Sequence, residues 1–148
     1  MRVLGLKFNK IIAEKFKEPD GNINIKSNFN IGKIEKTKVL GEEKDSVFGF
    51  EFTYTLEYED TAKIEFLGEI FMAIDKKLAK DLEKEKKIIP DELKTTLLNF
   101  ILFRTHTEAL HLEERLSLPF HVSAPRASVN SKDLKDTNWE NYYNLVNH

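Results

Sequence analysis

The sequence predicts a single-domain α+β protein. The first half of the chain alternates apolar and polar residues with a period of two, which is typical of β-strands. The second half changes to the three- and four-residue spacing of amphipathic helices. The chain has 148 residues, of which 41% are hydrophobic and 32% are charged. This composition is typical of a soluble globular protein, and the length allows a substantial core. We therefore expect residues 1–148 to form one domain.

The clearest strand pattern lies in the middle of the chain. From Phe48 to Tyr58 every second residue is aromatic or aliphatic, and the same alternation resumes between Ala62 and Ile74. The short segment Glu59-Asp60-Thr61 separates the two runs. This arrangement predicts an antiparallel hairpin with one buried face.

Two further strands are predicted before the hairpin. Leu4, Leu6 and Phe8 alternate with other residues, which indicates a first strand. After a turn-forming cluster at residues 19–22, a second alternating run extends from Ile23 to Ile31. We expect a bend or β-bulge at Gly32, because the alternation continues out of phase beyond it.

Helical spacing begins after the second hairpin strand. A short helix is predicted within Lys76–Lys86, and Pro90 suits the first position of a long helix. Apolar residues between Leu93 and Leu112 cover more than one face of that helix, whereas a surface helix of a monomer normally has one apolar stripe. The excess predicts burial from two sides. A last amphipathic helix is expected to start near Ser131 or Asp133.

The sequence offers little support for catalysis. The chain has no cysteine, and its six glycines form neither a GxGxxG motif nor a P-loop. His106 and His111 are five residues apart, so they point about 140° apart around a helix and do not suggest a metal site. His121, between two apolar residues, is interpreted as a residue that lines a binding surface. We expect no catalytic residue, no metal and no cofactor.

Charge and hydropathy bear on partners and location. A net charge of −2 gives no general attraction to nucleic acid. No apolar run is long enough for a membrane span or a signal peptide. We therefore expect a cytoplasmic protein that neither binds nucleic acid nor inserts into a membrane.

Several aromatic residues fall outside the predicted strands. Phe16 precedes a turn, Phe120 lies in a proline-bounded loop, and three more aromatics lie on the last predicted helix: Trp139, Tyr142 and Tyr143. Such residues can supply large contact area without requiring a particular partner sequence. Contact with other polypeptides and packing within an oligomer are equally compatible with this pattern.

Two segments resemble the SecB-like chaperone family. Leu118–Pro125, with the sequence LPFHVSAP, resembles the loop between the two helices of that family. Gly68–Ile74, with the sequence GEIFMAI, resembles the end of its last strand. The order of the predicted elements agrees as well, so the resemblance extends over nearly the whole chain.

The resemblance implies a four-stranded antiparallel sheet with a long helix and a C-terminal helix packed on one face. It also implies a homo-oligomer, with a tetramer favoured, that assembles through the first strand and the long helix. The matching interface residues would be Leu4, Leu6, Phe8, Leu97, Phe100, Ile101 and Phe103. The matching client-binding residues would be Phe16, Phe120, Val122, Leu134, Trp139, Tyr142 and Tyr143.

The function that the resemblance implies is that of an ATP-independent holdase, which binds unfolded or non-native polypeptides in apolar grooves. A link to protein export or to a toxin–antitoxin system stays open. Two alternatives compete with this hypothesis. One is a small-ligand-binding α+β protein or an enzyme with a pocket between sheet and helices, and the other is an adaptor for a single protein partner.

Overall fold

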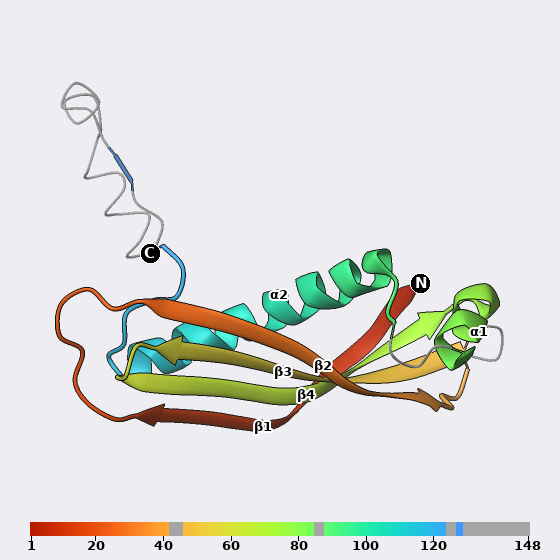
Figure 1. The fold of residues 1–148 in the computed structure, drawn as a ribbon, viewed down its shortest axis with the longest axis horizontal. Coiled ribbons are helices and arrows are strands. Elements are labelled where there is room, and N and C mark those ends of the chain that lie inside the picture. The colour runs from red at the N-terminus through yellow and green to blue at the C-terminus, as the bar shows by residue number, and fades with distance from the viewer. Residues whose placement is uncertain (42–45, 85–87, 124–126, 129–148) are drawn as a thin grey trace, which may run out of the picture.

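Four long strands followed by two helices make up the described part of the chain (Figure 1). The structure is a computed structural model that describes residues 1–41, 46–84, 88–123 and 127–128. Its elements are β1 (Arg2–Lys15), β2 (Ile25–Thr37), β3 (Ser46–Tyr58), β4 (Ala62–Ile74), α1 (Lys76–Lys84) and α2 (Asp91–Arg115). The predicted α+β class and the predicted order of these elements are confirmed. The expected C-terminal helix lies outside the described residues.

The strands form an antiparallel sheet in the order β1-β4-β3-β2. The predicted hairpin is confirmed as the central pair, with a register that runs from Ser46 opposite Ile74 to Tyr58 opposite Ala62. At its turn, Asp60 has a left-handed backbone (φ 51°), and the Thr61 N–H donates to the Tyr58 carbonyl at 2.7 Å. The hairpin strands therefore occupy the centre of the sheet, while β1 and β2 form its edges.

Both edge strands are irregular. β1 is longer than its alternation suggests, because its register against β4 shifts between Val3 and Gly5 and again between Phe8 and Lys10. As a result Val3 packs against the core together with Leu6 and Phe8. In β2 the register shifts between Ile31 and Ile34, which confirms the irregularity predicted at Gly32.

The core lies between one face of the sheet and the helices. The even-numbered residues of β3 and β4 make up most of it, and α2 covers this face along its length (Figure 1). At Gly68 the alternating row lacks a side chain, and the ring centroids of Phe8 in β1 and Phe52 in β3 lie 6.3 Å apart. The aromatic side chains of β1 and β3 thus approach each other across β4, beside the glycine.

The buried residues of α2 recur at every fourth position: Leu93, Leu97, Ile101, Thr105, Ala109 and Glu113. A step of four residues advances about 40° beyond a full helical turn, so this row winds around the helix. Winding is what contact with a twisted sheet requires. It explains part of the broad apolar surface that the sequence shows between residues 93 and 112.

Two of the expected interface residues belong to this winding row. Leu97 and Ile101 are 0% exposed and are part of the core of their own chain. Phe100 is half-buried and packs against the core, whereas Phe103 is 76% exposed. Only part of the apolar excess on α2 therefore stays uncovered.

Neither of the two described helices combines the length and the apolar character that crossing a membrane would require.

Candidate functional site

The C-terminal end of α2 is fixed in place by backbone contacts. Ser117 has a left-handed backbone (φ 53°), and the Leu118 N–H donates to the Glu113 carbonyl at 2.8 Å, which turns the chain back toward the helix. Lys15, at the end of β1, donates from Nζ to the Leu116 carbonyl at 2.8 Å. The loop after α2 is thus tied both to its own helix and to the sheet edge.

A buried carboxylate holds the next part of this loop. Glu113 is 0% exposed, and its Oε2 accepts hydrogen bonds from the Tyr58 hydroxyl at 2.5 Å and the His121 backbone N–H at 2.7 Å. The Nδ1 atom of His121 lies 2.7 Å from Oε1 of the same carboxylate. An ionised carboxylate is an acceptor only, so in that state the Nδ1 atom facing it has to carry hydrogen.

The pKa of Tyr58 is raised well above the ordinary tyrosine value, first by burial and then by its hydrogen bond to Glu113. Both causes disfavour the phenolate, because it would be a second negative charge in a buried place. Tyr58 therefore remains a neutral hydrogen-bond donor at physiological pH.

The loop presents its apolar residues outward and its histidine inward. The His121 side chain is 7% exposed, whereas its neighbours Phe120 and Val122 are 45% and 40% exposed. Beside them the His106 ring of α2 meets the His121 ring edge-on, with centroids 5.4 Å apart. The loop and the helix together form a mainly apolar groove of about 640 Å³, lined by His106, Thr107, Leu110, His111, Glu114, Phe120, Val122 and Ser123.

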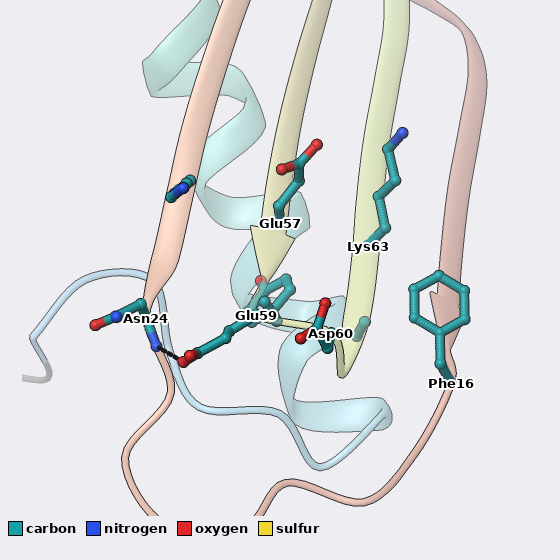
Figure 2. A pocket seen from close by; sticks show the side chains of 9 residues that line it. Phe16, Asn24, Glu57, Glu59, Asp60 and Lys63 are labelled. Atoms are coloured by element: carbon teal, nitrogen blue, oxygen red, sulfur yellow. Dashed lines mark hydrogen bonds between the residues drawn. The ribbon is translucent and has the colours of Figure 1, made fainter.

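A second hollow, of about 380 Å³, lies at the β3–β4 turn on the opposite face of the sheet (Figure 2). Charged side chains of alternating sign line it, because Lys26, Glu57 and Lys63 are cross-strand neighbours in one row. Asn24 closes one side, with its backbone N–H donating to the Glu59 carboxylate at 2.9 Å. Phe16 borders this hollow at its outer side and is 58% exposed.

The structure brings together only part of the expected client-binding set. Phe120 and Val122 line one groove, whereas Phe16 borders the hollow on the other face of the sheet. The remaining four residues, Leu134, Trp139, Tyr142 and Tyr143, lie outside the described residues. Of the expected interface residues, Leu4, Leu6 and Phe8 belong to the edge strand β1 and are partly exposed.

Several residues of the groove escaped the sequence reasoning. The sequence predicts no role for His106 and His111, and it places Leu110 only among the apolar residues of the long helix. The pairing of Glu113 with His121 is not part of that prediction either. The one available signal was a histidine between two apolar residues in a proline-bounded loop, since such a position suggests a specific partner for the imidazole. In the parts of the chain that the structure describes, no three acidic or histidine side chains are grouped so that they could hold a metal ion.

The architecture, with its four-stranded antiparallel sheet and its helices on one face, is a SecB-like fold. A solved structure with this fold is the SecB-like chaperone Rv1957 of Mycobacterium tuberculosis, in complex with a ChAD peptide from the antitoxin HigA1 (Rv1956). The two chains superpose with a TM-score of 0.54 at 17% identity, over 86% of this chain and 89% of the other. At this identity the likeness shows the fold alone. No protein-family model and no curated protein sequence matches the chain.

Proposed function

We propose that this protein is an ATP-independent chaperone that holds extended apolar segments of non-native polypeptides in the groove between α2 and the loop after it. The observation that carries the proposal is the orientation of that loop, which exposes Phe120 and Val122 while it buries His121. Exposed apolar side chains beside a groove of this size are typical of interaction sites.

The proposed mechanism is passive. A non-native polypeptide exposes aromatic and aliphatic side chains, and burying them against Phe120, Val122 and Leu110 removes apolar surface from water. Such burial contributes about 25 cal/mol per Å², from which the cost of ordering the client has to be subtracted. One groove therefore gives weak binding, and several grooves on an oligomer would add avidity. Nothing in this mechanism requires nucleotide hydrolysis or covalent chemistry.

The solved SecB-like neighbour supports the same proposal. That protein was solved with a peptide of an antitoxin bound, so its fold can present a peptide-binding surface. By analogy, clients of this chain could be general non-native proteins, an export precursor or one dedicated antitoxin. A dedicated adaptor would capture a single partner, whereas a general holdase would capture many.

We also propose that the protein is a homo-oligomer, with a tetramer favoured, and that it acts in the cytoplasm. The exposed side chain of Phe103 on α2 and the position of β1 at the edge of the described sheet support assembly between copies. The small-ligand alternative has its best candidate in the charged hollow of Figure 2. A thermal-shift screen in which metabolites, but not peptides, raise the melting temperature would favour that alternative.

Aggregation of a chemically denatured enzyme, followed by light scattering without ATP, tests the holdase function. We expect the protein to suppress aggregation and the double variant Phe120→Ala, Val122→Ala to lose most of this effect. Leu40→Ala is the matched control, because Leu40 is a fully exposed apolar residue outside the groove. Equal suppression by the double variant and the control would remove the groove from the proposed site, and no suppression by the wild type would contradict the function.

A further inference from the structure

The loop after α2 reverses the usual burial preference of its residues. In folded proteins, phenylalanine and valine are mostly buried, while histidine is intermediate. Here the His121 side chain is 7% exposed, and Phe120 and Val122 on either side of it are left near half exposure. A local force has to hold the histidine inside, because the hydrophobic effect acting on its neighbours favours the opposite arrangement.

That force comes from Glu113. Its Oε2 accepts a hydrogen bond from the His121 backbone N–H at 2.7 Å, and its Oε1 lies 2.7 Å from Nδ1 of the same histidine. Two contacts to one residue fix both the position of the backbone and the orientation of the ring. The Tyr58 hydroxyl, at 2.5 Å, anchors the carboxylate to β3 and so to the centre of the sheet.

A buried carboxylate is a costly way to fasten a loop. Replacing a buried polar or ionic pair by apolar residues of similar volume is often neutral or stabilising. An apolar residue at position 121 could also be buried here without any partner at position 113. Stability alone therefore gives no reason for this pairing, whereas a need to display Phe120 and Val122 does.

We propose that Glu113, Tyr58 and the buried His121 act together as positioning residues, which hold Phe120 and Val122 out into the groove and so preorganise it for an extended apolar peptide. This inference rests on the proposed function and adds to it a set of residues that set the affinity of the groove without touching the peptide. Preorganisation raises affinity because the loop does not have to be ordered at the moment of binding.

Hydrogen exchange and peptide binding, measured on the same full-length variants, test the proposal. The test variant is Glu113→Leu combined with Tyr58→Phe, which leaves neither a buried carboxylate nor an unpaired tyrosine hydroxyl at this place. Glu113→Gln is the conservative variant, since its amide oxygen can still accept from Tyr58 and the His121 N–H. Glu108→Leu is the matched control, because Glu108 is exposed on α2 outside the groove lining.

Binding is followed by fluorescence anisotropy of a labelled peptide rich in aromatic and aliphatic residues. In the double variant we expect the His121 amide to exchange at least about tenfold faster and the Kd for the peptide to rise about tenfold. Glu113→Gln and Glu108→Leu should stay within about twofold of the wild type in both measurements. Circular dichroism establishes that each variant is folded.

Three results would overturn the proposal. Unchanged exchange at His121 in the folded double variant would mean that Glu113 does not hold the loop. Faster exchange with an unchanged Kd would mean that the loop position does not set the affinity. A wild type that binds no peptide would contradict the proposed function itself, and the exchange measurement would then still decide whether Glu113 holds the loop.

Discussion

At the scale of single residues, burial of the Glu113 carboxylate is the feature with the largest free-energy cost to compensate. Removing a charge from water costs several kcal/mol unless hydrogen bonds or an opposite charge compensate. Glu113 has three such contacts, two of them with His121 and one with Tyr58. Among the described residues, no buried side-chain nitrogen or oxygen lacks a hydrogen-bond partner. The network at this end of α2 is thus complete, and removing any one member should be costly.

Tyr58→Phe should lower the free energy of unfolding by about 1.5–3 kcal/mol, the usual value of a hydrogen bond to a charged group. The ring volume is kept, so the loss comes from the hydroxyl that donates to Glu113. Urea unfolding monitored by circular dichroism measures it. Tyr54→Phe is a matched control, because the Tyr54 hydroxyl lies 3.4 Å from Ser27 and makes a weaker contact. Equal losses in the two variants would contradict the special role of Tyr58.

The same residue makes a prediction about pH. The pKa of Tyr58 is higher in the folded protein than the ordinary value of 10.0, so the neutral phenol contributes stability that is fully present below pH 10. As the pH rises above 10, unfolded Tyr58 ionises while folded Tyr58 does not, and this contribution is lost. The difference in unfolding free energy between wild type and Tyr58→Phe should therefore shrink between pH 9 and pH 11, as urea titrations at both values would show. A free-energy difference between the two proteins that does not change with pH would contradict the raised pKa of Tyr58.

At the scale of elements, Gly68 determines how β1 joins the sheet. A Cβ at this position would meet the Lys7 carbonyl of β1 and would lie 2.7 Å from Cζ of Phe52. The absence of a side chain lets the edge strand and the Phe52 ring approach β4 closely. The interruption at residue 68 in the alternating pattern of β4 is thus a packing requirement.

Gly68→Ala should destabilise the protein by about 1–3 kcal/mol, the usual cost of overpacking a core. Gly5→Ala is the matched control in β1, because a Cβ there meets no atom within 4 Å. Thermal unfolding of both variants distinguishes the two positions. A loss in Gly5→Ala as large as that in Gly68→Ala would indicate that the strand backbone, and not the contact with Phe52, sets the effect.

The sequence predicted the central elements well because their patterns are long and local. The hairpin has an uninterrupted period of two from Phe48 to Tyr58, and Pro90 marks the start of α2, which begins at Asp91. β1 was predicted only as far as Phe8, because two register shifts move its inward-facing residues out of phase. An edge strand with bulges carries no simple period, so its length cannot be predicted in this way.

The candidate site was predicted less completely, because its contacts join distant parts of the chain. The loop after α2 could be singled out from Phe120 and Val122 and from the resemblance. The contact of Glu113 with Tyr58 spans 55 residues and depends on how α2 crosses the sheet. In the sequence, a glutamate on the buried row of a helix looks like an interruption of that row. No local pattern reveals which distant residues form hydrogen bonds with its buried carboxylate.

At the scale of the whole molecule, apolar surface stays exposed at separate places. Phe103 and Leu102 lie on the outer side of α2 and are 76% and 41% exposed, while Phe120 and Val122 lie at the end of that helix. Under the proposed function, the surface around Phe103 serves assembly between copies and the surface around Phe120 serves client binding. The two activities should therefore be separable by mutation.

Phe103→Glu should convert the expected oligomer into smaller species, because it places a charge on the proposed interface. Light scattering coupled to size-exclusion chromatography measures the mass. The melting temperature of the single chain should change little, since Phe103 contributes little to its own core. A wild type that is already a monomer, or a variant of unchanged mass, would contradict assembly through this surface.

The strand order β1-β4-β3-β2 has a consequence for how the chain folds. β3 and β4 are joined by a tight turn, whereas Arg2 of β1 pairs with Ala73, some seventy residues away. Because distant pairings require a larger loss of chain entropy, the hairpin should form the nucleus, and the two outer strands should add to it later. In a pulse-labelling hydrogen-exchange experiment, the amides of Phe50 and Ile70 should become protected earlier during refolding than the amide of Leu6. During synthesis, the first strand of this protein would thus wait, unpaired and open to other chains, until its partner has been made.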